Sequence, residues 1–228
     1  MSSPPFPILY EDNHLLAISK PAGLATMGTP DDRATVLSEA KEYIRQKYNK
    51  PGNVYLGVVS RLDGPVTGVL LIARTSKAAR RLTEQFRTRT VEKSYLAIVS
   101  GRIRPARGEC IDHLASHPRH RKMQIVGPRM PGAKEARLRY ETIGPLAGGT
   151  LLRVEILTGR KHQIRLQLAS RGHPIHGDRK YGSTTVWPTG IALHSHRLRI
   201  KHPTLDKDIE IIAPPPECWG LADADLSD

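Results

Sequence analysis

Hydrophobic residues recur every three or four positions in three segments of the chain, residues 34–47, 76–87 and 162–171. This spacing places the apolar side chains on one face of a helix, so each segment is predicted to be an α-helix. Thr75 or Ser76 is positioned to cap the first turn of the second helix. Gly172 and the proline that follows it are expected to end the third.

Other segments are rich in β-branched residues or alternate between apolar and polar positions, which is typical of strands. We predict strands at residues 15–19, 55–59, 68–73, 94–100, 136–144, 150–157, 191–200 and 207–212. Few of them are separated by a crossover as long as a helix. The pattern therefore predicts an α+β fold with a mixed, largely antiparallel central sheet flanked by helices and loops.

Prolines interrupt both ends of the chain. Pro4, Pro5 and Pro7 keep the start out of a helix, and residues 214–216 are three consecutive prolines followed by a short acidic tail. Because no linker separates the segments between them, we expect one domain over residues 8–213. Residues 1–7 and 214–228 are expected to be an irregular start and a Pro-rich acidic end.

The two cysteines, Cys110 and Cys218, lie far apart among 228 residues. Their number and spacing argue against a disulfide framework and a zinc knuckle. The N-terminus has neither the basic region nor the apolar run of a signal peptide, and no apolar stretch is long enough to span a membrane. The predicted location is the cytoplasm.

Positive charge is concentrated in one part of the chain. Residues 102–201 hold 20 Lys and Arg against 6 Asp and Glu, whereas the remaining residues hold 15 against 16. The surplus of 14 in the first group, less 1 in the second, gives the formal net charge of +13. A basic field of this size attracts polyanions, and nucleic acid is the usual partner, although a solvated face or acidic lipid would also explain it.

A charged loop separates two predicted strands. Residues 60–68 read Ser-Arg-Leu-Asp-Gly-Pro-Val-Thr-Gly, so Arg61 and Asp63 lie between apolar runs. Charged groups in such a place must be paired or exposed in a cleft. A structural Arg–Asp pair in a turn and a functional site both remain open at this point.

Residues 157–165 lead from a strand into the third predicted helix, and Arg160, Lys161 and Arg165 add three cations there. Exposed amides at a helix start favour an anion, so a phosphate or carboxylate suits this segment. Arg165 is a candidate partner for keeping Asp63 ionised. The alternative is a basic helix start on a solvated face. Tyr95, on the strand predicted at residues 94–100, is by itself more typical of core packing.

The ten histidines do not predict a metal site. His113, His117 and His120 lie close in sequence, but carboxylates are scarce and basic neighbours surround them. The Gly-x-Ser-x-Gly pattern of serine hydrolases and a Gly-rich Walker loop are also absent from the sequence.

Taken together, these segments resemble the RluA-type pseudouridine synthases. The family's His-Arg-Leu-Asp-x-x-Thr-Ser-Gly stretch, which carries its catalytic aspartate, corresponds to residues 60–68. Residues 8–12 and 20–23 resemble the family's opening segment, 93–97 its tyrosine strand and 158–165 its third motif. Residues 173–178, Leu193-His194 and His202-Pro203 follow in family order. The likeness extends from residue 8 to about residue 212.

The resemblance implies a pseudouridine synthase catalytic domain that isomerises uridine to pseudouridine in ribosomal or transfer RNA without a cofactor. A monomer is the default expectation, and no metal is expected. Asp63 would be the nucleophilic or charge-stabilising carboxylate, with Tyr95 and Arg165 completing the catalytic set. Ile164 would line the uracil, and Arg61 would fill the space left by a flipped base. Cations for the RNA backbone would be Arg160, Lys161, Arg119, Arg121 and Lys122.

Two departures from the family pattern stand beside the aspartate: Ser60 replaces the usual His, and Val66-Thr67 replaces Thr-Ser. The N-terminal RNA-binding module of many relatives is also not expected in this chain. A catalytically inactive RNA-binding or ribosome-assembly protein of the same fold is therefore the main alternative. A nucleoside hydrolase using the same carboxylate is a third reading.

Overall fold

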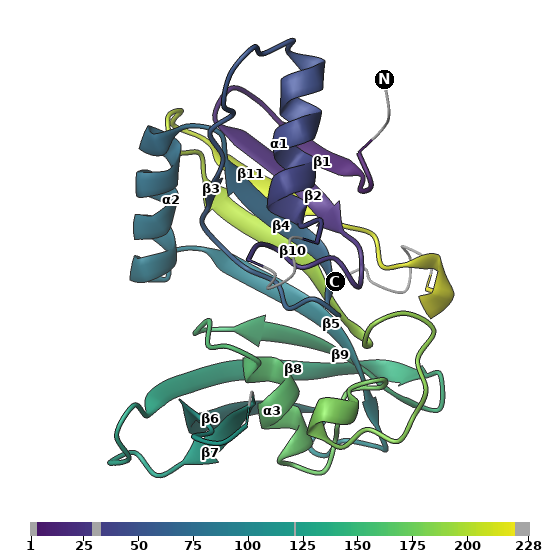
Figure 1. Ribbon diagram of the computed structural model, residues 1–228. Coiled ribbons are helices and arrows are strands. Elements are labelled where there is room, and N and C mark those ends of the chain that lie inside the picture. The colour runs from purple at the N-terminus through teal and green to yellow at the C-terminus, as the bar shows by residue number, and fades with distance from the viewer. Residues whose placement is uncertain (1–3, 29–32, 121, 222–228) are drawn as a thin grey trace. The chain divides into compact units, whose positions relative to one another are not determined.

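The computed structural model describes residues 4–28, 33–120 and 122–221, and within them the chain forms two compact units (Figure 1). Unit 1 comprises residues 1–92 and 195–215, and unit 2 comprises residues 93–194 and 216–228. These units are defined by packing, not by independent folding. The single catalytic domain expected over residues 8–213 therefore stays a prediction.

Unit 1 is built on a sheet in which β1 (Ile8–Glu11), β2 (Leu15–Lys20), β4 (Thr67–Ala73) and β10 (Leu193–Lys201) follow one another. The short strand β3 (Gly57–Val58) pairs with β4, and β11 (Asp208–Ile212) pairs with β10. The pairings β1–β2, β2–β4, β3–β4 and β10–β11 are antiparallel. The predicted α+β class with a largely antiparallel sheet is confirmed.

Both faces of the unit 1 sheet are covered by helices, α1 (Val36–Lys47) and α2 (Ser76–Thr88) (Figure 1). Successive side chains of a strand point to opposite faces, which divides the core in two. One cluster joins Leu16, Ile18, Leu70 and Ile72 to Val36, Ala40 and Ile44 of α1. The other joins Leu15, Ala17, Val69 and Leu71 to Ala78 and Leu82 of α2. This burial on both faces explains why β2 and β4 are almost continuously apolar.

Both helices begin where the sequence provides a cap. The Thr35 side chain accepts a hydrogen bond from the Ser38 amide, and the Ser38 hydroxyl oxygen accepts one from the Thr35 amide, which forms a capping box. The Thr75 hydroxyl accepts from the Ala78 amide at 3.2 Å. The predicted role of Thr75 as the N-cap of α2 is confirmed.

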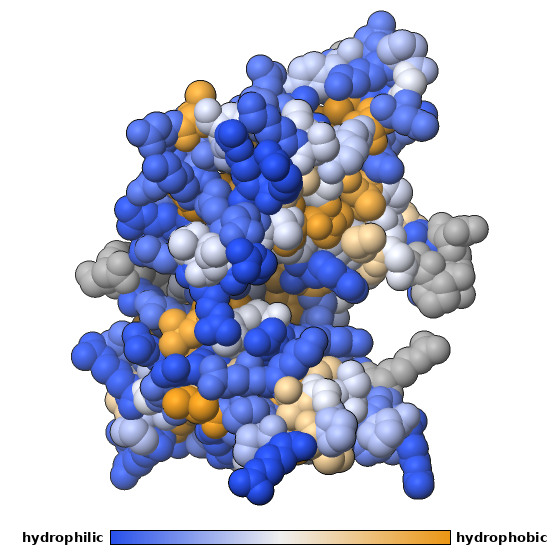
Figure 2. All heavy atoms as spheres, turned by 90° about the vertical axis from the view of Figure 1, so that its left-hand side faces the viewer, coloured by the Kyte–Doolittle hydropathy of each residue, from blue (hydrophilic) through white to orange (hydrophobic). Residues whose placement is uncertain are grey.

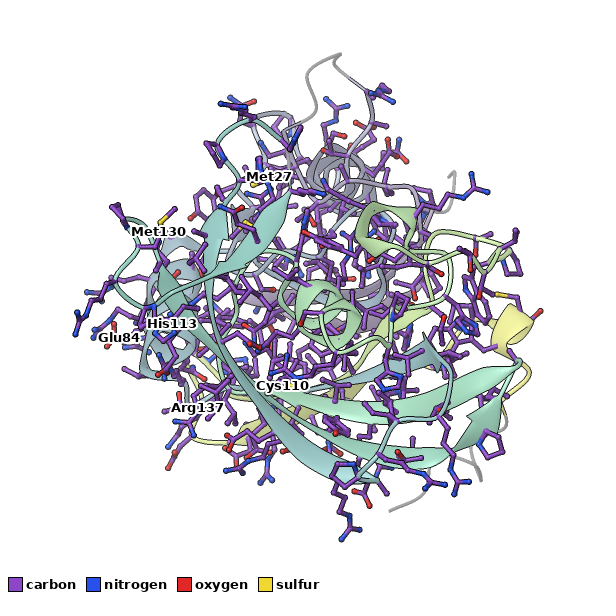
Figure 3. The ribbon with its side chains drawn as sticks, turned by 90° about the horizontal axis from the view of Figure 1, so that it is seen from below. Met27, Glu84, Cys110, His113, Met130 and Arg137 are labelled. Carbon is purple, nitrogen blue, oxygen red and sulfur yellow. The ribbon has the colours of Figure 1, made fainter. Side chains whose placement is uncertain are left out.

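Unit 2 contains five strands in the order β5-β9-β8-β6-β7, each antiparallel to its neighbour. Their bounds are β5 (Glu92–Ser100), β6 (Arg107–Ser116), β7 (Met123–Val126), β8 (Lys134–Leu146) and β9 (Gly149–Ile156). Helix α3 (Gln163–Ala169) packs on this sheet beside Cys110, as Figure 3 shows from below. The buried Gln167 amide fixes it there by donating to the Cys110 carbonyl at 3.3 Å and the Ala136 carbonyl at 3.2 Å.

Two short 3-10 helices complete unit 2, η1 (Arg179–Tyr181) and η2 (Glu217–Trp219). The hairpin between β8 and β9 turns on Ala147 and Gly148, with φ of 48° and 75°. Two consecutive residues with positive φ are the mark of a type I′ turn, whose twist matches that of the flanking strands.

Several predicted bounds were wrong. The third helix ends at Ala169, not at residue 171, and of the strand predicted at residues 55–59 only Gly57–Val58 pairs. Strands β1, β6 and β7 were not predicted. β6 intersperses charged residues along its length, and β1 and β7 span only four residues each, so neither gives a clear two-residue period. Arg121 and the acidic tail lie outside the described residues.

Candidate active site

The loop that carries Asp63 is held by backbone and hydroxyl hydrogen bonds on both sides of the aspartate. The Leu62 carbonyl accepts from the Thr26 hydroxyl at 2.9 Å, and the same hydroxyl accepts from the Leu62 amide at 3.2 Å. On the other side, the Gly64 carbonyl accepts from the Gly23 amide at 2.9 Å. The Val66 amide closes the turn on the Asp63 carbonyl at 3.0 Å. The half-buried Asp63 carboxylate is therefore presented on a fixed loop.

Lys20 adds a second restraint to this loop. Its ammonium donates to the carbonyls of Pro21 at 2.7 Å, Leu24 at 2.8 Å and Gly64 at 2.9 Å, and the residue is 1% exposed. Burial lowers the pKa of Lys20 to about 8, and the nearby negative charge of Asp63 opposes that shift. Lys20 thus joins the opening segment to the aspartate loop and supplies a buried positive charge near Asp63.

Arg61 stands two residues before Asp63 and is exposed. This exposure agrees with the role predicted for Arg61, because a side chain that fills the space of a flipped base must reach solvent before the nucleic acid binds. The role itself stays a prediction.

Tyr95 lies on β5 opposite Val154 of β9 and is 8% exposed. Lys93 precedes it by two positions and therefore projects from the same face of the strand. Burial lowers the pKa of Lys93. The Tyr95 phenol is thus accompanied by a half-buried lysine that was not selected from the sequence.

Arg165 lies in α3 and forms a two-pronged ion pair with Asp178. Its Nε donates to one carboxylate oxygen at 2.7 Å and its Nη2 to the other at 2.9 Å, and both side chains are buried. This fork matches a carboxylate with two parallel hydrogen bonds, which fixes the plane of the guanidinium. Ile164, the neighbouring residue predicted to line the uracil, is also buried.

One amide just before α3 is occupied by a side chain of the chain itself. The side-chain oxygen of buried Gln163 accepts from the Arg160 amide at 3.0 Å and from the Thr158 hydroxyl at 2.7 Å. The Arg160 amide is therefore engaged internally, and the anion site expected at the start of the helix stays a prediction. Arg160 itself donates through Nε to the Glu135 carbonyl at 2.8 Å, whereas Lys161 is exposed.

The cations predicted to grip RNA include two at the tip of the hairpin between β6 and β7. Arg119 and Lys122 are exposed there. The ring centroids of His117 and His120 lie 4.4 Å apart in the same turn. The pKa of His117 is lowered by burial and by its neighbours His120 and Lys122. A cation-rich, exposed turn of this kind is suited to a phosphate backbone.

The predicted catalytic and substrate-binding residues are divided between the two units. Asp63 and Arg61 belong to unit 1, and Tyr95, Ile164 and Arg165 belong to unit 2. Within unit 2, Arg165 pairs with Asp178. In the sequence, Asp178 stands out only as the last residue of the family-like segment 173–178. The expected pairing of Arg165 with Asp63 stays a prediction.

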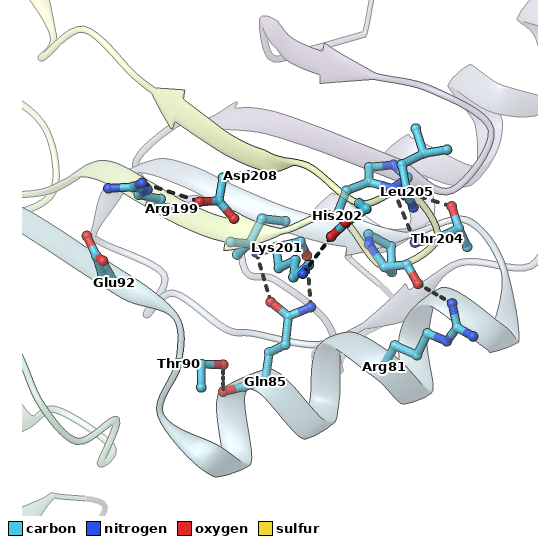
Figure 4. Close-up of a pocket in the computed structure, with 13 residues that line it drawn as sticks. Arg81, Gln85, Thr90, Glu92, Arg199, Lys201, His202, Thr204, Leu205 and Asp208 are labelled. Carbon is cyan, nitrogen blue, oxygen red and sulfur yellow. Dashed lines mark hydrogen bonds and ion pairs between the residues drawn. The ribbon is translucent and has the colours of Figure 1, made fainter.

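A cavity of about 650 Å³ lies elsewhere in unit 1, between α2 and the β10–β11 turn (Figure 4). Arg199 and Asp208, which line it, pair with each other at 3.3 Å, and Lys201 pairs with Asp206 at 2.7 Å. None of the predicted site residues lines this cavity. It is therefore a groove with balanced charges and is separate from the aspartate loop.

Among the described residues, no group of three or more His, Cys, Asp or Glu side chains is placed to hold a metal ion. No helix in the described part of the chain is long and apolar enough to cross a membrane.

Sequence reasoning missed Lys20 and Thr26 as residues that hold the aspartate loop. A signal for Lys20 was present, because a charged residue directly ends the apolar run of β2 and is followed by a proline. Thr26 gave no such signal, since a threonine in a loop is usually solvated.

The profile of the RNA pseudouridylate synthase family matches residues 14–170, a span that includes Asp63, Tyr95 and Arg165. The chain belongs to this family.

Two relatives illustrate the likeness. A ribosomal large subunit pseudouridine synthase D of Nitrosomonas europaea is 36% identical over 209 residues, which are 87% of this chain and 59% of the relative. The RNA pseudouridine synthase YhcT of Bacillus subtilis, described as uncharacterized, is 34% identical over 92% of this chain and 68% of its own length. The chain thus spans about three fifths of the first of these relatives.

Solved structures agree with the fold. Human RNA pseudouridylate synthase domain containing 1 superposes with a TM-score of 0.73 at 26% identity, over 96% of this chain and 89% of that one. The human domain-containing 4 protein gives a TM-score of 0.78 over 94% and 90%, and its 24% identity supports the fold alone.

Proposed function

We propose that this chain isomerises specific uridines to pseudouridine in structured RNA, ribosomal or transfer. In this reaction the bond from uracil N1 to ribose C1′ breaks, the base turns, and a new bond forms from C5 to C1′. The proton on C5 leaves and N1 gains one, so the product is an isomer and no electrons are exchanged. A reaction of this kind requires positioned acid–base and charge-stabilising groups and no redox cofactor.

One observation carries the proposal. The carboxylate of Asp63 stands on a loop whose neighbouring residues, Leu62 and Gly64, are fixed by Thr26, Gly23 and Lys20. A reacting carboxylate must be held within a fraction of an ångström of its target, and fixed backbone on both sides supplies that precision. A buried lysine near the acid is costly to keep in a protein whose active site no longer functions. Its presence favours a catalytic protein over an inactive RNA-binding protein of the same fold.

The other residues take complementary roles in this proposal. Tyr95 stacks on the uracil and removes the C5 proton late in the reaction, Ile164 forms an apolar wall, and Arg165 stabilises the negative charge of Asp63. The target uridine must leave its stack to reach them, at a cost of about a few kcal/mol. Arg61 fills the space that it leaves.

RNA is held by the basic surface of unit 2. Arg119 and Lys122 on the hairpin tip, together with Lys161 and Arg160, contact phosphates without reading bases. Arg121, which lies outside the described residues, is proposed to join them. The enzyme is proposed to act as a monomer in the cytoplasm, without a metal ion.

The test uses RNA from cells that lack this gene product, labelled with tritium at uridine C5. Wild-type protein is expected to release tritium, and Asp63→Asn to release it at least about a thousandfold more slowly, because an amide cannot replace the carboxylate. Asp206→Asn, which changes an exposed acid of the same unit, is the matched control and should be fully active. Full turnover by Asp63→Asn on a natural substrate would remove Asp63 from the site.

Product analysis separates the alternatives. Pseudouridine in the RNA supports the proposal, free uracil indicates a hydrolase, and tight RNA binding without either product indicates an inactive binding protein. Tyr95→Phe should fold and bind RNA normally while turnover falls about a hundredfold, since the phenol proton carrier is lost. Unchanged turnover would exclude Tyr95 from the chemistry.

A further inference from the structure

Arg165 is held from two directions by one short segment of unit 2. Asp178, the N-cap of η1, grips the edge of the guanidinium with hydrogen bonds of 2.7 and 2.9 Å. Tyr181, the last residue of η1, places its ring against the guanidinium, whose central carbon lies 5.2 Å from the ring centroid. A cation over an aromatic face is attracted by the ring quadrupole. The carboxylate fixes the plane of the guanidinium and the ring covers its face.

The hydroxyl of Tyr181 reaches two other elements. It accepts a hydrogen bond from the Met123 amide at 3.0 Å, and it lies 2.7 Å from Nδ1 of His162. Met123 is the first residue of β7 and directly follows Lys122 at the tip of the basic hairpin. The phenol therefore joins the end of the hairpin to the segment that begins α3.

His162 is placed where its position matters for Arg165. It is the N-cap of α3 with a left-handed backbone, φ 55°, and its side chain makes no capping hydrogen bond. A non-glycine residue in this conformation persists only where the surroundings hold it. The Tyr181 hydroxyl and an edge-to-face ring contact, with centroids 5.6 Å apart, hold it here. Arg165 follows three residues later on the first turn of the helix.

We propose that Tyr181 is a positioning residue that couples the RNA-binding hairpin to Arg165. Its ring sets the orientation of the guanidinium, and its hydroxyl fixes both the tip end of β7 and the start of the helix that carries the guanidinium. A hairpin engaged on RNA thereby orders the arginine. This inference rests on the proposed function, and it assigns to Tyr181 a role in turnover without contact to the substrate.

The experiment compares Tyr181→Phe with wild type under saturating RNA. Phenylalanine keeps the ring and removes only the hydroxyl, so the fold and the RNA dissociation constant are expected to stay within about twofold. kcat is expected to fall about tenfold with KM unchanged. Tyr140→Phe is the matched control, because Tyr140 is a buried tyrosine of the same unit that donates a 3.4 Å hydrogen bond to the Pro105 carbonyl.

Two measurements distinguish positioning from general loosening of the structure. Hydrogen exchange at the Met123 amide should accelerate in Tyr181→Phe and not in Tyr140→Phe. In a double-mutant cycle, the loss caused by Tyr181→Phe should nearly disappear when Arg165 is already replaced by lysine, since the phenol acts through the guanidinium. Additive losses, an unchanged Met123 exchange rate, or equal losses in both tyrosine variants would each overturn the inference.

Failure of the proposed function looks different. In that case wild-type protein forms no pseudouridine in any RNA. Failure of the present inference leaves wild-type turnover intact and Tyr181→Phe equal to it.

Discussion

Lys20 Nζ donates a 2.9 Å hydrogen bond to the carbonyl of Gly64, the residue that follows Asp63. With its other two donors on the Pro21 and Leu24 carbonyls, the ammonium uses all three of its hydrogens on backbone oxygens. Loss of one proton therefore removes one of these three Lys20 hydrogen bonds and the positive charge near Asp63.

Turnover is accordingly expected to decline on the alkaline side with an apparent pKa near 8, the value to which burial lowers Lys20. A kcat profile from pH 6 to pH 10 measures it. Lys20→Arg keeps its charge throughout this range, so any activity that it retains should lack the decline. An unchanged alkaline limb in Lys20→Arg would assign the pKa to another group.

The lowered pKa of Lys20 also affects stability: as pH rises, stability is expected to increase while turnover declines. The pKa of Lys20 is about 8 in the folded chain against an ordinary value of 10.5, so the unfolded chain binds more protons between these limits. The contribution of Lys20 to the free energy of unfolding should therefore rise between pH 8 and 10.5, by at most about 3 kcal/mol. Denaturant titrations of wild type and Lys20→Met across this range test it: their difference should change with pH, and a constant difference would contradict the expectation.

Gly68 is expected to tolerate no side chain. Its φ is 108°, and a Cβ added there would lie 2.2 Å from the Ser195 carbonyl oxygen. Gly68→Ala should lower the free energy of unfolding by more than about 2 kcal/mol, because backbone must move on both sides. Gly64→Ala, in the loop before β4, is the control, since beyond its chain neighbours no atom lies within 4 Å of its added Cβ. Chemical denaturation should show equal stability for the control and wild type, and a similar loss in both variants would refute the steric reason.

Removing Asp178 should be more costly than removing an acid whose cationic partner is partly exposed. Asp178→Asn breaks the buried ion pair between Asp178 and the Arg165 guanidinium, and breaking such a pair typically costs about 3–5 kcal/mol. Asp112→Asn is the comparison, because its partner Arg171, at 2.9 Å, is 34% exposed and can be hydrated. Thermal unfolding of the two variants ranks them. A loss in Asp112→Asn as large as that in Asp178→Asn would show that burial does not set the cost.

The hairpin cations should influence RNA binding through salt. Replacing Arg119 and Lys122 by glutamine is expected to reduce the slope of log affinity against log salt by about 1.4 to 1.8, since two phosphate contacts are lost. Fluorescence anisotropy with labelled RNA at several salt concentrations measures the slope.

The control places the same charge change on α2, by replacing Lys77 and Arg87. Both are exposed, and α2 belongs to the largely hydrophilic face that Figure 2 shows. The control should keep the wild-type slope. An equal fall in both double variants would indicate that binding responds to net charge and not to the hairpin.

The predictable part of the fold is the part in which the burial pattern repeats. Helices α1 and α2 were predicted almost to the residue, because Val36, Ala40 and Ile44 repeat at helical spacing and Thr75 provides a cap. Strand β6 was missed because its mixed polar and apolar residues give no local strand pattern. It is held in place by a long antiparallel pairing with β8. Pairing with another strand, and not a local sequence pattern, determines this element.

The candidate site was predictable where a charged residue stands between apolar stretches of sequence. Asp63 and Arg165 stand out as charges between apolar segments, so they could be selected from the sequence. The partner of Arg165, Asp178, lies 13 residues away in a loop, and Tyr181 is an ordinary tyrosine until its contacts with Met123 and His162 are known. Such residues are defined by geometry in space, which a sequence does not display.

Unit 1 is assembled from two pieces of chain separated by the whole of residues 93–194. One of its two hydrophobic clusters needs Leu198, Ile209 and Ile211, which are translated only after residues 93–194. During synthesis β4 is therefore made long before β10, its neighbour in the finished sheet. The nascent chain must carry an unpaired apolar edge while residues 93–194 are translated, which makes that interval a period of raised risk of aggregation.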